Sequence, residues 1–210
     1  MTMKVLSVLV GQPEKTSAKI GLTGHFKKPV AEAEITKDGV AGDHIMDRNN
    51  HGGVDQAVYI FGEVDRAWWA EALDRDVPPG FFGENLLVSD LETGGLAIGD
   101  VMTIGNVILQ IASPRIPCAT YAAHIGDGQA LKQFYAAGRP GAYARVLESG
   151  AVGVGAAVTL SPYTGDRITM VDNMQAYLGK FADDAFLGRA LNVPAHYKLH
   201  DLARQRLGAA

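Results

Sequence analysis

The stretch VMTIGNVILQI, residues 101–111, is the clearest indication of the fold. Residues 101–104 and 107–111 are short and β-prone, and Gly105-Asn106 between them is the kind of two-residue connection that closes a hairpin. Further strand-like segments lie on both sides, at residues 3–10, 30–35, 57–61 and 156–160. Short strands in a chain with 25 glycines favour a closed or nearly closed β structure over alternating β-α-β units.

Helical segments are predicted mainly in the C-terminal part of the chain. Residues 63–73 begin with acidic side chains and carry apolar residues near helical spacing, which indicates one helix among the strands. Pro162, Gly165 and Asp166 then interrupt the chain after the last strand-like segment. We therefore expect a β domain, residues 1–165, and a helical tail, residues 166–210. Three short helices are predicted in the tail, at residues 171–178, 183–191 and 195–207.

The composition is that of a folded, water-soluble protein, with 47% hydrophobic and 20% charged residues. A net charge of -4 gives no basic field for a phosphate backbone, so nucleic acid is excluded as the main partner. The N-terminal segment MTMKVLSVLV lacks the features of a signal peptide, and no apolar stretch is long enough to span a membrane. We expect a cytoplasmic protein without a membrane partner, in which the single cysteine forms no internal disulfide.

The segment around that cysteine is the first candidate site. Pro114 and Pro117 restrict the backbone and hold Arg115 and Cys118 in one loop after a strand. A thiolate is a ligand for a soft metal, and a guanidinium group binds phosphate through two parallel hydrogen bonds. Taken alone, Cys118 is better explained as a small buried hydrophobic residue and Arg115 as a surface charge, a preference that the other motifs of the chain reverse.

A second candidate site is the polar loop of residues 42–55, GDHIMDRNNHGGVD. His51 and Asp55 are able to exchange protons, and Gly52 and Gly53 allow a ligand to approach the backbone closely. The alternative is a tight turn that an aspartate caps. Zinc binding by the histidines and aspartates of this loop, His44 and Asp43 included, is weakly supported because the usual ligand spacing is absent.

Two further segments carry polar side chains that suit a ligand. Glu84 and Asn85 are placed to contact the edge of a heterocycle, although Asn85 would equally satisfy turn amides and Glu84 would equally be solvated. Lys15 and Ser17 lie in a loop that could contact an anion, but the glycine spacing of a P-loop is absent and a solvated charged loop explains them better.

Taken in order, five motifs resemble the MOSC domain, the C-terminal domain of molybdenum cofactor sulfurases, and in particular its stand-alone bacterial branch, the YiiM-like proteins. They are GDH at residues 42–44, HGGVD at 51–55, FGENL at 82–86, GD at 99–100 and PRIPC at 114–118. The resemblance covers nearly the whole chain. It implies a mainly β, α+β fold: a MOSC-type β-barrel with a few peripheral helices, followed by a small three-helix unit.

The resemblance also implies a cofactor and a reaction. Cys118 would be the ligand of molybdenum in a molybdopterin cofactor, and Arg115 would hold the cofactor's phosphate. Relatives of this kind reduce N-hydroxylated purines and related base analogues, a detoxification that takes electrons from a redox protein. Sulfurases carry pyridoxal phosphate on an upstream domain for which the chain leaves no room, so that cofactor is not expected.

We therefore expect Cys118, His51 and Asp55 to be catalytic. The cofactor-binding residues are expected to be Arg115, Lys15, Ser17, Gly52, Gly53, Glu84 and Asn85. A homodimer is possible. The main alternative is a non-catalytic carrier that holds the cofactor or a persulfide on Cys118 and passes it to another enzyme. A zinc hydrolase would instead require His44 and His51 to converge on one metal.

Overall fold

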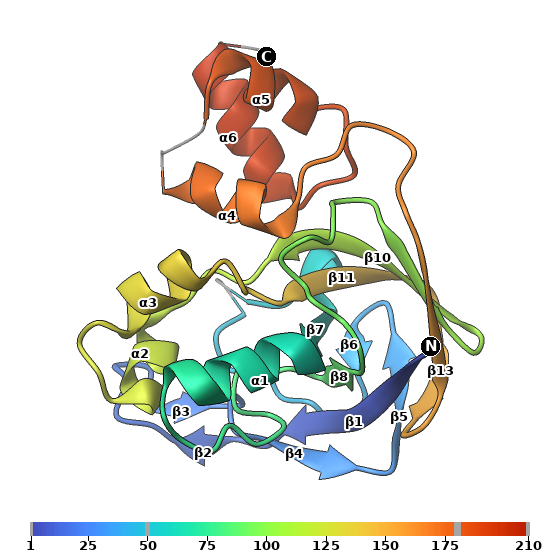
Figure 1. Cartoon of the computed structure of the whole chain (residues 1–210), viewed down its shortest axis with the longest axis vertical. Coiled ribbons are helices and arrows are strands. Elements are labelled where there is room, and N and C mark those ends of the chain that lie inside the picture. Colours follow the sequence, from blue (N-terminus) through green and yellow to red (C-terminus); the bar gives the residue numbers. More distant parts are fainter. Residues whose placement is uncertain (1, 49–50, 179–181, 209–210) are drawn as a thin grey trace.

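The computed structural model of the chain describes residues 2–48, 51–178 and 182–208. Its centre is a closed ring of seven strands (Figure 1). In order around the ring these are β1 (Met3–Gly11), β13 (Ala157–Ser161), β9 (Val101–Ile104), β10 (Val107–Pro114), β11 (Ala142–Glu148), β7 (Val58–Gly62) and β8 (Leu86–Val88). The ring closes where Met3 and Lys4 of β1 pair with Val158 and Ala157 of β13. This confirms the predicted closed β structure and the hairpin at Gly105-Asn106.

Smaller sheets surround the ring. β4 (Lys27–Val30) extends it beyond β1, while β12 (Gly150–Gly153), β5 (Glu32–Thr36) and β6 (Gly39–Val40) form a separate sheet. β2 (Glu14–Lys15) pairs with β3 (Leu22–Thr23). The prediction of one strand over residues 30–35 is wrong, because β4 pairs with β1 and β5 pairs with β12, so the chain changes sheets at Ala31.

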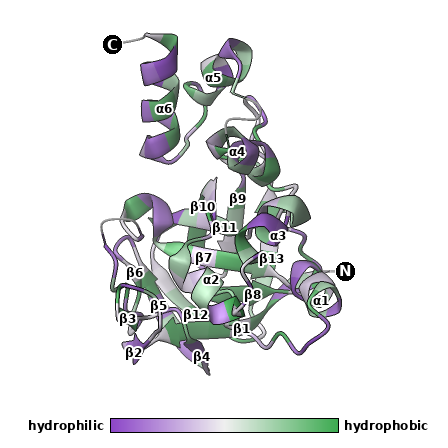
Figure 2. Ribbon diagram, turned by 90° about the vertical axis from the view of Figure 1, so that its left-hand side faces the viewer, coloured by the Kyte–Doolittle hydropathy of each residue, from purple (hydrophilic) through white to green (hydrophobic). Residues whose placement is uncertain are grey.

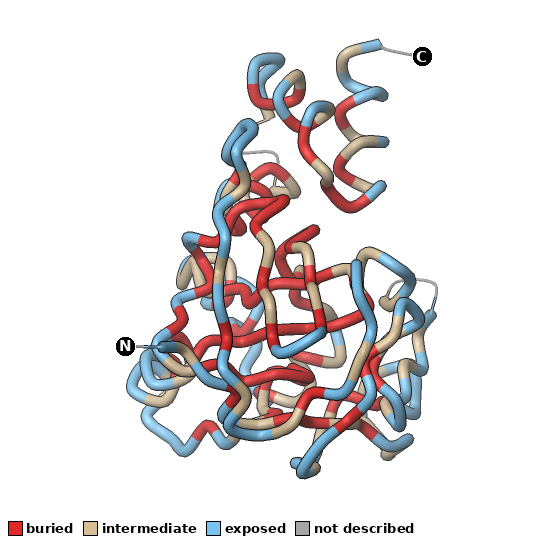
Figure 3. The backbone as a smooth tube through the Cα atoms, turned by 90° about the vertical axis from the view of Figure 1, so that its right-hand side faces the viewer, coloured by how far each residue is buried: buried red, intermediate tan, exposed pale blue. Residues whose placement is uncertain are grey.

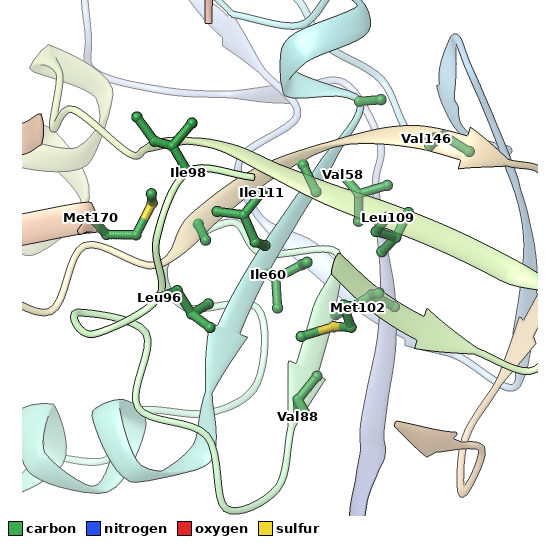
Figure 4. Packing of buried hydrophobic residues seen from close by; sticks show 14 of the residues in the cluster. Val58, Ile60, Val88, Leu96, Ile98, Met102, Leu109, Ile111, Val146 and Met170 are labelled. Carbon is green, nitrogen blue, oxygen red and sulfur yellow. The ribbon is translucent and has the colours of Figure 1, made fainter. Parts of the chain in front are cut away.

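The core fills the inside of the ring. Along β9, Met102 and Ile104 are buried while Val101 and Thr103 are half-buried, which is the alternation expected of a strand with one face inward. Figure 4 shows side chains from different strands, among them Ile60, Leu109 and Ile111, packed together in this interior. Figure 2 shows hydrophobic ribbon through the ring and hydrophilic ribbon at β2 and β4.

Three helices lie beside the ring, namely α1 (Glu63–Ala72), α2 (Ala119–Ile125) and α3 (Ala130–Ala137). A short 3-10 helix, η1 (Val54–Gln56), precedes β7. Trp69 of α1, Tyr121 of α2 and Phe134 of α3 are buried in one aromatic cluster around Phe82. Helix α2 matters for function because it begins directly after Cys118.

The tail contains α4 (Met170–Tyr177), α5 (Asp184–Ala190) and α6 (Tyr197–Leu207), each within two residues of its predicted bounds. The tail lies beside β10 and β11 (Figure 1). Its apolar residues, such as Phe186 and Leu199, belong to the same buried cluster as those of the ring. Figure 3 shows buried segments both in the strands and in the tail helices, whereas residues 162–167, which connect β13 to the tail, are mostly exposed. Within the described ranges, none of the helices has the length and apolar character needed to cross a membrane.

Candidate functional site

Cys118 lies in the short connection between strand β10 and helix α2. The strand ends at Pro114, and Cys118 occupies the N-cap position of α2 in an extended conformation, with φ -126° and ψ 178°. Its thiol is free and half-buried. The two prolines that mark this loop in the sequence therefore stand between a sheet edge and a helix start, where they fix the direction in which the thiol points.

Two cavities meet at this thiol. The first, which we call the charged cavity, has a volume of about 90 Å³ and is lined by Arg115, Lys27, Asp43 and His25, among others. The second, the tail-side cavity, has a volume of about 440 Å³ and extends to residues of the helical tail. Both cavities are lined by Ile20, Asp47, His51, Gln56, Cys118, Thr120 and Tyr143. A ligand in either cavity therefore reaches Cys118.

The surroundings of Cys118 favour its thiolate. Burial on its own would raise the pKa of the thiol, but a hydrogen bond with His51 and the positive charge of Arg115 lower it to about 6. The backbone N–H of Tyr121, in the first turn of α2, acts in the same direction. Cys118 is therefore mostly ionised at neutral pH, which is the form that binds a metal.

Arg115 is a buried cation whose side chain forms no ion pair with a described carboxylate. Its guanidinium lies 5.1 Å from the ring centre of Tyr59, and Nη2 lies 3.4 Å from Nδ1 of His25. Its Nε is buried without a described hydrogen-bond partner. A buried charge is costly unless an opposite charge or hydrogen bonds compensate it, so this position favours an anionic ligand.

Asp43 connects three segments of chain beside Arg115. Its carboxylate accepts hydrogen bonds from Gly11 N at 2.7 Å and from Asn85 Nδ2 at 2.9 Å, and it pairs with the buried Lys27. Asn85 in turn accepts a hydrogen bond from Tyr59 N at 3.1 Å. Burial lowers the pKa of Lys27, and Asp43 opposes that shift. Through Asp43, the network places the ammonium group of Lys27 and the side-chain amide of Asn85 at the wall of the charged cavity.

His25 completes this wall. Because the guanidinium of Arg115 can only donate, His25 accepts through Nδ1, so its proton sits on Nε2, which is buried without a described partner. Burial and the nearby charge of Arg115 hold the pKa of His25 well below its ordinary value. Gly83 lies against this ring, since a Cβ there would come 2.6 Å from Nδ1 of His25. The glycine of the FGENL motif is therefore required by close packing.

The structure brings together half of the residues expected at the site. Cys118, His51, Gly52, Arg115 and Asn85 all line the charged cavity. Gly52 adopts φ 84°, a conformation that favours glycine.

The other expected residues line neither cavity. They are Asp55, Lys15, Ser17, Gly53 and Glu84. Glu84 is buried and accepts hydrogen bonds from Gly80 N and Phe82 N, so it organises the FGENL turn. Asp55 pairs with Arg145 at 2.8 Å and accepts a hydrogen bond from Tyr197 N. Lys15 belongs to the β2–β3 pair, and Gly53 precedes η1.

The alternative of a zinc site, weakly supported by the sequence, finds no support in the structure. Among the described residues, no group of three histidine, cysteine, aspartate or glutamate side chains could hold a metal ion. Nδ1 of His44 instead lies 3.2 Å from the carbonyl oxygens of Gly11 and Gly42. The GDH motif is thus part of the scaffold that shapes the cavity.

Several lining residues escaped the sequence interpretation. His25 precedes the edge strand β4 and Lys27 is its first residue, in a segment with no recognisable motif. Tyr59 and Tyr143 have the pattern of ordinary strand residues. His196 lies beside the Asn192-Val193-Pro194 break, where a polar N-cap was the only available signal. These residues reach the site through tertiary folding, which local patterns do not encode.

Comparison with known proteins agrees with this architecture. A family model described as the MOSC domain matches residues 47–159. The protein YflK of Bacillus subtilis is 35% identical over 159 residues, which cover 74% of this chain and 72% of YflK. A protein named reductase from Gibberella moniliformis is 26% identical across 98% of this chain, which spans only 38% of that protein.

The fold is also known from solved structures. The crystal structure of YiiM from Geobacillus stearothermophilus superimposes with a TM-score of 0.80 at 24% sequence identity, covering 98% of this chain and 99% of that one. The strand ring, the flanking helices and the helical tail therefore occur together in a protein that aligns with this chain over almost its whole length. The matched family model and the identity with YflK show that the chain belongs to the MOSC domain family.

Proposed function

We propose that the chain is an oxidoreductase that binds a molybdenum cofactor and reduces N-hydroxylated purines and related base analogues. One observation carries this proposal: Arg115 is a buried cation without a described carboxylate partner, and it lies in the same cavity as the thiolate of Cys118. The pair offers a soft metal ligand and an anion-binding group within one cavity. A cofactor that combines molybdenum with a phosphate has the two features that this pair would bind.

The residues of the charged cavity fit such a group. Cys118 would be the metal ligand, while Arg115 and Lys27 would bind the anionic part of the cofactor. The buried and unpartnered Nε of Arg115 and Nε2 of His25 are N–H donors available to oxygen atoms of the ligand. When bound, the cofactor supplies a two-electron redox centre suited to oxygen transfer.

The chain's own residues would supply binding and protons. Reduction of an N-hydroxyl group to an amine consumes two electrons and two protons and releases water. His51 lines both cavities and hydrogen-bonds the thiol of Cys118, so it is placed to deliver a proton to a substrate beside the thiol. We assign proton transfer to His51, with Tyr143 forming part of the shared wall.

The electrons would come from a separate redox protein. The Gibberella protein named reductase aligns with this chain over 38% of its own length, so most of that protein lies outside the shared region. An electron-supplying part is one function that such additional sequence would provide. The chain described here would receive its two electrons from a partner of the same chemical class.

A carrier of cofactor or sulfur is less well supported. Transfer of a group to another enzyme requires a thiol that the acceptor protein reaches directly. Cys118 is half-buried and lies at the junction of two cavities, one of them large enough for a small-molecule substrate. That arrangement favours chemistry on a bound molecule.

Metal content tests the proposal. The chain would be expressed in cells that synthesise molybdopterin, and molybdenum and pterin would be measured per chain in wild type, Cys118→Ala and Cys118→Ser. We expect stoichiometric metal in wild type and background metal in both variants, because neither side chain replaces a soft thiolate. Ser161→Ala, at an exposed strand end, is the control and retains its metal. A folded Cys118→Ala protein that remains loaded and active contradicts the proposal.

A further inference from the structure

The tail-side cavity differs in character from the charged cavity. Its walls are largely apolar, with Pro114, Ile116, Pro117 and Tyr143 from the ring side and Tyr177 from the tail. Polar side chains also line it, among them Lys19, Asp47, Gln56 and Lys198. Ser113 lines this cavity, and its buried hydroxyl has no described hydrogen-bond partner. A cavity whose walls are mainly apolar and that also offers polar side chains to the edges of a ligand is typical of a site for a flat organic molecule.

His196 is the buried polar residue that the tail contributes to this cavity. Three successive residues fasten it to the ring. Ala195 O accepts a hydrogen bond from Arg145 at 3.1 Å, His196 N donates to Ala112 O at 3.1 Å, and Tyr197 N donates to Asp55 at 3.2 Å.

Arg145 and Asp55, which hold the two neighbours of His196, are themselves paired at 2.8 Å. We call them the Asp55–Arg145 pair. One ion pair therefore fixes the backbone on both sides of a single histidine. Immobilisation of this kind is what a ligand-binding side chain needs.

The orientation of the imidazole is also determined. Lys198 N donates a hydrogen bond to Nδ1 of His196 at 3.1 Å. Burial lowers the pKa of His196, so the ring is neutral at pH 7 and its proton resides on Nε2. No described residue accepts a hydrogen bond from that Nε2–H. The ring thus presents a neutral donor whose other nitrogen is already occupied.

We propose that His196 binds the substrate, with its Nε2–H donating a hydrogen bond to a ring nitrogen of a heteroaromatic base in the tail-side cavity. The Asp55–Arg145 pair is the positioning device that holds His196 in place. The purine identity of the ligand rests on the function proposed above. The apolar walls accept the faces of such a base, while Ser113 and His196 contact its edges. A neutral donor suits a neutral ring nitrogen, and the reacting group then extends toward Cys118, which lines the same cavity.

The test separates capping from ligand binding. His196→Asn keeps a side-chain oxygen able to cap Lys198 N but does not reach as far as Nε2 of histidine. Binding of adenine, the product expected from an N-hydroxylated purine, would be measured by calorimetry on protein isolated from molybdopterin-producing cells. Molybdenum and pterin content and the melting temperature would be measured on the same samples. Arg204→Gln, on the exposed side of the same helix and outside both cavities, is the control.

We expect His196→Asn to bind adenine about tenfold more weakly than wild type, the size expected for one lost hydrogen bond to a ligand. Its metal content and melting temperature should match those of wild type and Arg204→Gln. His196→Gln, whose amide extends to about the position of Nε2, should recover part of the affinity. In turnover, KM for the N-hydroxylated substrate should rise more than kcat falls.

Other outcomes overturn the inference. Equal adenine affinity in His196→Asn and wild type, or no adenine binding by wild type, shows that His196 does not bind this substrate class. Loss of molybdenum or pterin in His196→Asn shows that the residue serves the cofactor instead. If wild type contains no molybdenum but binds adenine through His196, the proposed reduction fails while the assignment of His196 stands.

Discussion

Cys118 shows how two opposing effects on one thiol are resolved by its immediate neighbours. Burial disfavours the thiolate, but His51 and Arg115 stabilise it enough to bring the pKa to about 6. Among the described residues, no carboxylate forms an ion pair with Arg115, so its positive charge stabilises the thiolate and is available to a ligand. Buried cation and ionised thiol therefore stabilise each other before any ligand binds.

The pH dependence of thiol alkylation tests this balance in cofactor-free protein. The rate of reaction with iodoacetamide should reach half its maximum near pH 6 in wild type. Arg115→Gln and His51→Leu should move that midpoint to higher pH, because each removes a group that lowers the pKa of Cys118. Lys15→Gln, remote from both cavities, should leave it unchanged. A wild-type midpoint near the ordinary thiol value of 9.0 contradicts the description of the site.

Three elements that are distant in sequence meet at the Asp55–Arg145 pair. Asp55 lies in η1, Arg145 in β11, and the pair holds the start of α6. Asp55 ends the HGGVD motif, which led us to expect that it transfers protons. Its position suggests instead that the motif contributes to holding the tail against the ring.

Variants of the two partners separate these roles. If Asp55 acts with Arg145, Asp55→Asn and Arg145→Gln should each reduce the free energy of unfolding by about 1–3 kcal/mol, since each leaves a partly buried group without its partner. Both should weaken adenine binding to a similar extent, and the double variant should cost less than the sum of the two. Urea unfolding and calorimetry measure these effects. An activity loss confined to Asp55→Asn, with Arg145→Gln unaffected, would restore the proton-transfer role.

At the scale of the whole molecule, one apolar core extends from the strand ring into the tail. Several histidines are enclosed in this fold in neutral form. Burial lowers the pKa of His25, His124 and His196, and Arg115 adds to that effect at His25. The unfolded chain, with ordinary histidine pKa values near 6.5, therefore binds more protons than the folded chain below that pH.

The free energy of unfolding should accordingly decrease as the pH falls below about 6.5, by about 1.4 kcal/mol per pH unit for each histidine that remains neutral in the folded state. Glu84, whose pKa is raised by burial, acts in the opposite direction, so the total slope is not the test. His25→Gln keeps an acceptor for Arg115 but does not titrate. Urea unfolding at pH 7.5 and 5.5 should show a smaller difference for this variant than for wild type, and equal differences would contradict the account.

Local sequence patterns predict much of this architecture, and the elements that were not predicted share a common cause. The hairpin at Gly105-Asn106 and the tail helices follow from turn chemistry and helical spacing, and both are present. Helices α2 and α3 were missed, because α2 starts at a cysteine without a capping side chain and α3 without a side-chain cap.

The site was predicted only where its residues share a motif. Arg115 and Cys118 are three positions apart and meet the same cavity, whereas His25, Lys27 and His196 come from segments that contact this region only after the ring has closed. The motif acids Glu84 and Asp55 satisfy backbone amides and an arginine, a scaffolding use that a sequence motif does not distinguish from chemistry.

The shared position of Cys118 between two cavities with different walls has an evolutionary consequence. The loop after β10 supplies the thiol, whereas Tyr177, His196 and Lys198 belong to a separate stretch of chain. Substitutions in the tail therefore reshape one compartment without disturbing the other. Ligand preference can diversify among descendants of a common ancestor while the charged cavity is inherited intact.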